Sequence, residues 1–234
     1  MVTTTRWLEL TDAIVGHGRG GGTPTPETWA AASIDVLGVA GAGIALMSGP
    51  RSGPLSASDP AAHVLEDLQY TLRQGPCVDA FRTGDAVSED DVEANMDRWP
   101  AFTPPLVQAG MGAVFAFPLA VGGARQGALT LYQQTPGPLA DQQQADAFAV
   151  AQIASLAVLE MQAGSPPERW ADGLAEAADC HAKIHQASGM VAVQLGIGVD
   201  AAYVRLRSHA YAEDRALADV ARDVVARRLR FNQS

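Results

Sequence analysis

Two adjacent prolines, Pro166 and Pro167, divide the chain into two parts with different sequence patterns. Paired prolines end any helix that precedes them, because proline has no backbone N–H and restricts the residue before it. Before this pair, helical patterns alternate with short apolar runs, and after it every pattern is helical. We therefore predict an α+β domain at residues 25–162, a linker at residues 163–169 and an all-α module at residues 170–234.

The α+β part contains short apolar segments bounded by glycine and proline, which is the pattern of strands. MGAVFAFPLAVGG and ARQGALTLYQQ are predicted to form two strands that meet at Gly122–Gly123, a sequence typical of a hairpin turn. The predicted sheet is mainly antiparallel and flanked by helices. Further strands are expected near residues 43–50, 53–58 and 86–88, and helices near residues 25–37, 59–73, 99–110 and 139–161.

Residues 1–24 are expected to form a flexible N-terminal segment. Its second half, GHGRGGGTP, is rich in glycine, which leaves the backbone free to adopt many conformations. Within this segment, residues 6–15 (RWLELTDAIV) have the pattern of a short helix.

Composition limits the class of protein. A hydrophobic fraction of 47% in 234 residues is sufficient for a sizeable core. No run approaches the roughly 20 apolar residues of a membrane span, and the first residues lack the pattern of a secretory signal. Two cysteines, Cys77 and Cys180, are too few for a disulfide framework or a cysteine-based zinc site. We therefore expect a cytoplasmic protein with no metal site and no membrane partner.

The charge is distributed unevenly along the chain. The net charge of −10 by itself argues against a nucleic acid as partner. Residues 183–234, however, contain eight basic and five acidic residues, which gives them a net charge of +3. The remaining residues carry −13. A basic module joined to an acidic one indicates that the C-terminal part contacts nucleic acid.

Sequence motifs of conventional enzymes are absent, and Cys77 is the one candidate for redox chemistry. In RQGPCVDAFRTG, Gly75 and Pro76 place Cys77 near the start of a helix, where the helix dipole lowers the pKa of a thiol. The alternative is a small buried apolar residue beside a turn, which is the more common environment of a free cysteine.

HQASGMVAVQLG, residues 185–196, has the apolar spacing of a helix but contains Gly189 in its middle. Glycine there costs about 1 kcal/mol relative to alanine. Close packing by another helix is the preferred explanation, and the approach of a partner subunit or a nucleic acid is the alternative. In the next helix, the shared face of Tyr203, Leu206 and Ala210 predicts that Tyr203 lies in the core.

EDLQYTLRQGPCVDAFRTGDAV, followed later by the strand GALTLYQ, resembles the GAF domains of actinobacterial regulators. The resemblance implies a six-stranded antiparallel sheet packed between helices, in a domain that senses a small molecule or mediates dimerisation. The ligand of such a domain is unknown from this sequence, and no cofactor is evident. A cyclic nucleotide is not implied, because its N-K-x-D-type signature is absent.

KIHQASGMVAVQLGIGVDAAYVRLRSHAYAEDRALADVARDVVARRLRF resembles the ANTAR domain, a three-helix module that binds RNA in transcription antitermination. The two resemblances together cover residues 27–234. The matching positions of the ANTAR domain lie in all three helices: Ile184, Gln186, Ala187, Gly189 and Met190, then Ala202, Leu206, Arg207 and Ala210, then Leu217, Val220 and Ala221.

Together the resemblances imply an RNA-binding regulator of transcription antitermination, not an enzyme. A homodimer would hold paired RNA hairpins and would act on RNA polymerase only indirectly. Two alternatives stay open: a GAF-fold redox enzyme or sensor that uses Cys77, and a helical module that binds DNA. The expected RNA-contact residues are Lys183, Ala187, Gly189, Arg205, Arg207, His209, Arg215 and Arg222, with Tyr203, His209 and Tyr211 as candidates for stacking on bases.

Overall fold

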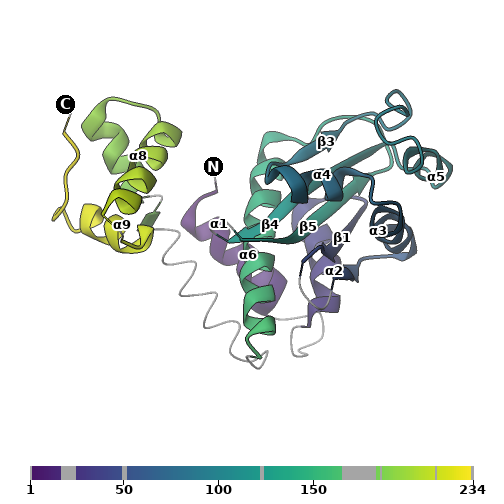
Figure 1. Cartoon of the computed structure of the whole chain (residues 1–234), viewed down its shortest axis with the longest axis horizontal. Helices are drawn as coiled ribbons and strands as arrows, with labels where there is room; N and C mark the ends of the chain where they lie inside the picture. The colour runs from purple at the N-terminus through teal and green to yellow at the C-terminus, as the bar shows by residue number, and fades with distance from the viewer. Residues whose placement is uncertain are drawn as a thin grey trace. The chain divides into compact units, whose positions relative to one another are not determined.

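The computed structural model describes residues 2–16, 25–48, 52–121, 124–164, 183–184, 186–213 and 215–232. The chain divides into two compact units, the first made mainly of residues 6–174 and the second mainly of residues 175–234 (Figure 1). The first unit is α+β and the described part of the second is helical, as the sequence predicts. The predicted linker, residues 163–169, lies largely outside the described residues.

The first unit is built on a five-stranded antiparallel sheet with the strand order β2-β1-β5-β4-β3. β4 (Ala113–Val121) and β5 (Ala124–Gln133) are its longest strands and form the predicted hairpin. β1 (Gly41–Leu46) pairs with β5, and the short strands β2 (Gly53–Ala57) and β3 (Val87–Glu89) form the edges. Among the described residues, the sheet has one strand fewer than the six that the GAF resemblance implies.

One face of this sheet carries large apolar side chains. Strand pairing and the alternation of side chains place seven large apolar residues on this face. Each has 2% or less of its surface exposed: Ile44, Leu46, Phe115, Phe117, Leu119, Leu129 and Leu131. α2 (Pro26–Leu37) and α6 (Asp141–Gln162) pack on this face. Phe117 contacts Phe148 of α6 edge to face, with ring centroids 4.9 Å apart. Each fully buried large side chain contributes about 1.5–3 kcal/mol to folding.

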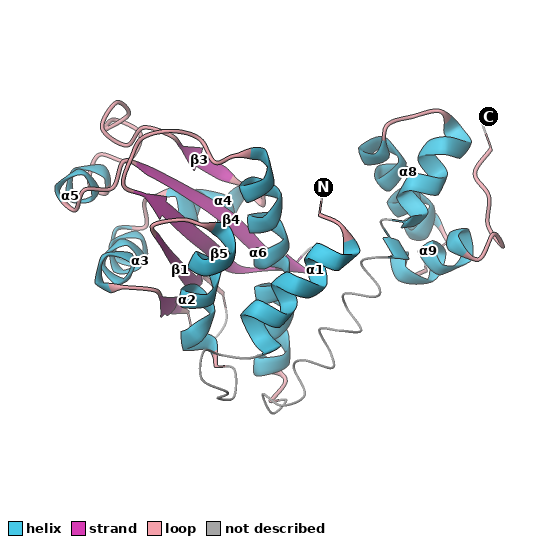
Figure 2. Cartoon of the chain, turned by 180° about the vertical axis from the view of Figure 1, so that it is seen from behind, coloured by secondary structure: helices cyan, strands magenta, loops and turns pink. Residues whose placement is uncertain are grey.

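The opposite face carries small and polar side chains. α3 (Pro60–Leu72) and α4 (Pro76–Thr83) cover this side (Figures 1 and 2), and Leu106 of α5 (Thr103–Gln108) joins the same core cluster. Because the strand side chains are short, α3 comes close to the backbone of β1. The small and polar residues of this face are Gly43 and Ala45 in β1, Ala116 in β4, and Ala128 and Thr130 in β5; the paired Val114 and Tyr132, at one end of β4 and β5, lie on the same face.

The second unit contains three helices among its described residues: one over residues 186–195, α8 (Val199–Ala212) and α9 (Leu217–Val225). Gly196, with a φ of 66°, follows the first helix and ends it, as the sequence predicts. The predicted three-helix module is confirmed. Its core consists of small and medium apolar side chains from all three helices: Ala187, Val191, Ala202, Leu206, Ala210, Val220, Ala221 and Val224.

The N-terminal helix α1 (Thr4–Thr11) continues into a short π-helical turn, Asp12–Gly16. Its apolar side chains are three or four residues apart and therefore share one face. Three of them are buried: Trp7, Leu10 and Ile14. The expectation that residues 1–24 are flexible is therefore wrong for this helical part, whereas the short helical pattern within them is confirmed.

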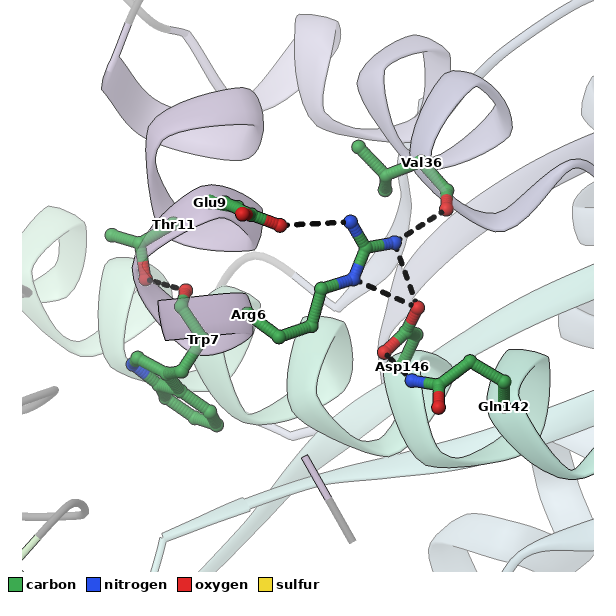
Figure 3. Close-up of polar contacts among 7 residues, drawn as sticks. All are labelled: Arg6, Trp7, Glu9, Thr11, Val36, Gln142 and Asp146. Atoms are coloured by element: carbon green, nitrogen blue, oxygen red, sulfur yellow. Dashed lines mark hydrogen bonds and ion pairs between the residues drawn. The ribbon is translucent and has the colours of Figure 1, made fainter. Parts of the chain in front are cut away.

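An ion pair fixes α1 against α6 (Figure 3). Nε and Nη2 of Arg6 donate hydrogen bonds to Oδ2 of Asp146 at 3.1 and 2.8 Å, and Nη2 also donates to the carbonyl of Val36 in α2. Nη1 pairs with the exposed Glu9 at 3.2 Å. The side chain of Asp146 is only 4% exposed. Its charge therefore depends on Arg6, which joins three helices.

We expect the substitution Arg6→Ala to lower the free energy of unfolding of the first unit by about 2–3 kcal/mol, because it leaves the buried carboxylate of Asp146 without a cationic partner. Urea unfolding followed by circular dichroism measures this change. Glu9→Ala is the matched control and should change little, because it removes only an exposed ion pair. Equal stability of the two variants would show that the Arg6–Asp146 pair does not hold α1 in place.

Candidate functional site

α8 carries two exposed arginines, Arg205 and Arg207, for which the described residues provide no ion-pair partner. Successive residues on a helix turn by about 100°, so two residues that are two positions apart point in nearly opposite directions. We call the side of α8 with Tyr203 and Arg207 the Arg207 flank, and the side with Arg205 and His209 the Arg205 flank. The two predicted contact residues therefore do not share one surface.

Tyr203 lies one helical turn before Arg207 and is 39% exposed. The prediction that it belongs to the core is wrong, because the buried positions of α8 are Ala202, Leu206 and Ala210. An accessible aromatic ring beside a guanidinium suits an unpaired base, which stacks on the ring while its phosphate contacts the cation. The Arg207 flank therefore has the chemistry of a single-stranded RNA contact.

On the Arg205 flank, the ring of His209 packs against Phe231, with ring centroids 5.1 Å apart. The backbone N–H of Phe231 donates to Oε1 of Gln194 at 2.8 Å, which fixes this C-terminal segment beside the first helix of the unit. His209 is thus already in contact with an aromatic ring and is less suited to stack on a base. The side chain of Tyr211, the third predicted stacking residue, lies outside the described part.

Three of the arginines near α9, Arg215, Arg222 and Arg228, form ion pairs within the module. Nη2 of Arg215 lies 2.6 Å from Oδ2 of Asp223, and Arg228 pairs with Oδ1 of the same carboxylate at 2.8 Å. Hydrogen bonds from Arg215 and Arg228 lower the pKa of Asp223 below its usual value. Arg222 pairs with Asp219. Arg215 and Arg222 are therefore partly neutralised by neighbouring acids, which weakens the prediction that they contact phosphates.

The predicted contact residues of the first helix differ in accessibility. Ala187 is completely buried in the core, so the prediction that it contacts RNA is wrong. Lys183 is partly buried. Gly189 faces open space, because a Cβ atom added there would have no described heavy atom within 4 Å. The preferred explanation, close packing of another helix on Gly189, is therefore wrong for the described residues. Val193, one turn later, is 85% exposed on the same side.

We expect Gly189→Ala to stabilise the second unit by up to about 1 kcal/mol, because alanine favours a helix and has room here. Gly189→Leu should also be tolerated. Ala187→Leu is the matched control in the core of the same helix, and overpacking there should cost about 1–3 kcal/mol. Thermal unfolding followed by circular dichroism compares the three variants. If Gly189→Leu were as destabilising as Ala187→Leu, a group that packs on Gly189 would be required.

The first unit contains a cluster of buried polar side chains between the sheet and helices α3 and α4: Glu66, Gln69, Cys77 and Thr130. Oε1 of Gln69 accepts a hydrogen bond from the backbone N–H of Cys77 at 2.7 Å, and its Nε2 donates to the hydroxyl of Thr130 at 3.4 Å. Gln69 thereby connects α3, α4 and β5. Of these residues, only Cys77 was singled out from the sequence. The available signal for the others was the spacing of Ala62, Leu65, Glu66 and Gln69, which places all four on the buried stripe of α3.

Glu66 is completely buried, and neither of its carboxylate oxygens has a partner with full hydrogen-bonding geometry among the described residues, although the Thr130 hydroxyl lies near enough to act on its pKa. Its side chain lies over Gly43 of β1, where a Cβ atom would come within 2.5 Å of Oε1. Burial raises the pKa of Glu66 to about 7; the Thr130 hydroxyl opposes this shift and the negative charge of Asp67 adds to it. The carboxyl group is therefore partly protonated near neutral pH.

Cys77 lies in the first turn of α4, as predicted, but its thiol is completely buried. Burial, together with the negative charge of Glu66, raises the pKa of the thiol well above its ordinary value. The thiolate is the reactive form of cysteine, so this environment disfavours redox chemistry. The expectation of a lowered pKa is wrong, and the alternative of a buried apolar residue is confirmed.

We expect Glu66→Gln to remove a pH dependence of stability. The pKa of Glu66 rises from 4.5 to about 7 on folding, so protonation favours the folded state. This stabilisation is complete below pH 4.5 and is lost as the pH rises to about 7. Relative to Glu66→Gln, the free energy of unfolding of the unsubstituted protein should fall by up to about 3 kcal/mol over this range.

Urea unfolding at several pH values between about 4 and 8 tests this prediction. Asp67→Asn is the comparison variant, which should keep the pH dependence but move it to lower pH, because it leaves Glu66 able to ionise and removes a negative charge that raises its pKa. Parallel pH profiles of the unsubstituted protein and Glu66→Gln would contradict the raised pKa of Glu66.

Metal sites and membrane-spanning helices are not found in the described part of the chain. Among these residues, no group of three or more histidine, cysteine, aspartate or glutamate side chains is arranged to hold a metal ion. None of the described helices is long and apolar enough to cross a membrane.

Two family models match the chain. The model of the GAF domain matches residues 28–159, and the model of the ANTAR domain matches residues 172–225. The first match contains the sheet and the buried polar cluster, and the second contains both flanks of α8. No protein of the curated set matches the chain.

Several solved structures are similar to this chain at low sequence identity. The GAF domain from Acinetobacter phosphoenolpyruvate-protein phosphotransferase is 11% identical with a TM-score of 0.50, and the match covers 70% of this chain and 97% of that one. A GAF domain/HD domain protein from Geobacter sulfurreducens is 14% identical with a TM-score of 0.44, over 69% and 96%. The type II free methionine-R-sulfoxide reductase from Thermoplasma acidophilum is 18% identical with a TM-score of 0.41, over 51% and 78%.

Proposed function

The chain belongs to the GAF domain family, and on that premise we propose that it is an RNA-binding regulator of transcription antitermination. In this proposal the GAF domain is sensory and controls the ANTAR domain that follows it. The GAF match covers more than half of the chain, and the ANTAR match includes all of α8 and α9. RNA is the expected partner, because the ANTAR domain is an RNA-binding kind of module.

The observation that carries this proposal is the exposed Tyr203 beside Arg207 on α8. RNA hairpins present unpaired loop bases, which proteins bind by stacking and by contacts to the flanking phosphates. The Arg207 flank provides one group for each kind of contact. It also lies within the residues that match the ANTAR domain.

The remaining predicted contact residues are ranked by their surroundings. Lys183 and the open backbone at Gly189 stay in the proposed RNA interface, and Arg205 stays as a contact on the opposite flank of α8. Arg215 and Arg222 contribute less, because carboxylates of Asp223 and Asp219 already pair with them. His209 supports the fold of the module by packing on Phe231 and is not expected to stack on a base.

We expect the protein to act as a homodimer that presents two ANTAR domains to a pair of RNA hairpins, in the cytoplasm, and to affect RNA polymerase only indirectly. Exposed apolar side chains on α1 and α6 support a contact between two first units: Leu8, Phe148 and Leu159.

The two alternatives differ in their support. The redox enzyme or sensor loses its main argument, because the thiol of Cys77 is buried and its pKa is raised. The DNA-binding module stays a rival, since three helices with exposed arginines also suit a major groove. A competition between RNA and DNA distinguishes these two partners directly.

We expect Tyr203→Ala and Arg207→Ala each to weaken RNA binding about tenfold, the first by removing a stacking surface and the second by removing a phosphate contact. Only Arg207→Ala should also reduce the salt dependence of binding, by about one counterion. The measurement is fluorescence anisotropy with hairpin RNAs that are recovered from the native cell by crosslinking and sequencing.

Arg205→Ala is the matched control, because it removes an equally exposed arginine from the other flank of α8. Its effect on affinity should be smaller than that of Arg207→Ala. Equal affinity of all three variants and the unsubstituted protein would refute the assignment of the Arg207 flank. Preferential binding of duplex DNA with the same sequence would refute the proposed function itself.

A further inference from the structure

We propose that the GAF domain is a proton-responsive device, in which a proton on Glu66 favours the state with α3 and α4 closed on the sheet. The inference is independent of RNA binding, because it rests on the interior of the first unit. Its basis is geometric: Glu66 is completely buried, and its two oxygens have no partner with full hydrogen-bonding geometry among the described residues. A neutral carboxyl tolerates such a position far better than a carboxylate.

The surroundings of Glu66 offer no cation to an ionised carboxylate. β1, β2 and β4 contain no titratable side chain. From its own helix, Asp67 adds negative charge and is itself paired with His63 at the surface. From α4, the neighbouring titratable group is the thiol of Cys77.

β5 carries two titratable groups, Tyr132 and Arg125, and both are engaged elsewhere. The hydroxyl of Tyr132 donates to Oδ1 of Asp59 at 3.1 Å, and Nη1 of Arg125 donates to the carbonyl of Phe81 at 3.0 Å. None of the charged groups that act on Glu66 in the described part of the chain is therefore positive.

Ionisation of Glu66 consequently favours a state in which water reaches the carboxylate. Gly43 leaves the side chain pressed against β1, so water can enter only if α3 moves away from the sheet. Such a movement breaks the hydrogen bond from the Cys77 backbone to Gln69, which joins α3 to the start of α4. Exposure of the Cys77 thiol is therefore a direct report of this opening.

The expected size of the effect follows from proton linkage. The pKa of Glu66 is about 7 in the closed state, and in a hydrated open state it returns to its ordinary value of 4.5. The equilibrium between closed and open states then shifts toward the open one by about tenfold between pH 6 and pH 8. Without Glu66 this shift is absent.

The test is the rate of alkylation of Cys77 in the full-length protein with Cys180→Ser, in which Cys77 is the only thiol. Each rate is divided by the rate of the same protein carrying Glu66→Gln, which corrects for the pH dependence of the thiol itself. We expect this ratio to rise about tenfold between pH 6 and pH 8. A constant ratio would overturn the proposal.

A second measurement needs no substitution of Glu66. Infrared spectroscopy of the unsubstituted protein should show a protonated carboxyl group that titrates near pH 7. Above that pH, backbone hydrogen exchange in α3 should be faster than the intrinsic pH dependence of amide exchange accounts for. Asp67→Asn should move both changes to lower pH, because it removes a negative charge that adds to the raised pKa. Hydrogen exchange in α3 that did not follow the carboxyl titration would also overturn the proposal.

Discussion

The first unit depends on the unequal faces of its central strands. In β1, β4 and β5, large apolar residues such as Phe117 alternate with glycine, alanine and threonine. The large side chains form a thick apolar layer under α2 and α6. The small ones let α3 approach the strand backbone so closely that Glu66 lies directly over Gly43. A sheet with large side chains on both faces would keep α3 further away and would leave no place for a buried polar cluster.

This alternation is readable from the sequence, and so are the features that depend on local pattern. The β4–β5 hairpin, the main helices and the three-helix module were predicted with small errors at their ends; β1, for example, ends at Leu46 rather than near residue 50. The buried face of α8 was not predicted correctly. Ala202 and Tyr203 both fit an apolar spacing with Leu206, and spacing alone does not decide which of them is buried.

Contacts between residues that are far apart in the sequence could not be predicted from local sequence patterns. Arg6 and Asp146 are 140 positions apart, and nothing local marks them as partners. The basic residues of the second unit could be counted, and the spacing of Asp219 and Arg222 on one helix allows them to pair, but the pairing of Arg215 with Asp223 requires the fold. A count of charge therefore overstated the cationic surface of this domain. The two exposed arginines lie on opposite flanks of α8, so the position of the positive charge matters as well as its amount.

Within the buried cluster, the presence of Gln69 is explained by its contribution to folding stability, whereas the presence of Glu66 is not. Gln69 uses its oxygen and its nitrogen to connect three elements of the domain. Glu66 makes no such bond among the described residues, and an apolar side chain of similar size would fill its place without the cost of burying a carboxyl group. Positions at which a sequence gives up stability are typical of functional sites. Gly43 and Glu66 come from different elements and fit each other closely, so the buried carboxyl group has a specific place against β1.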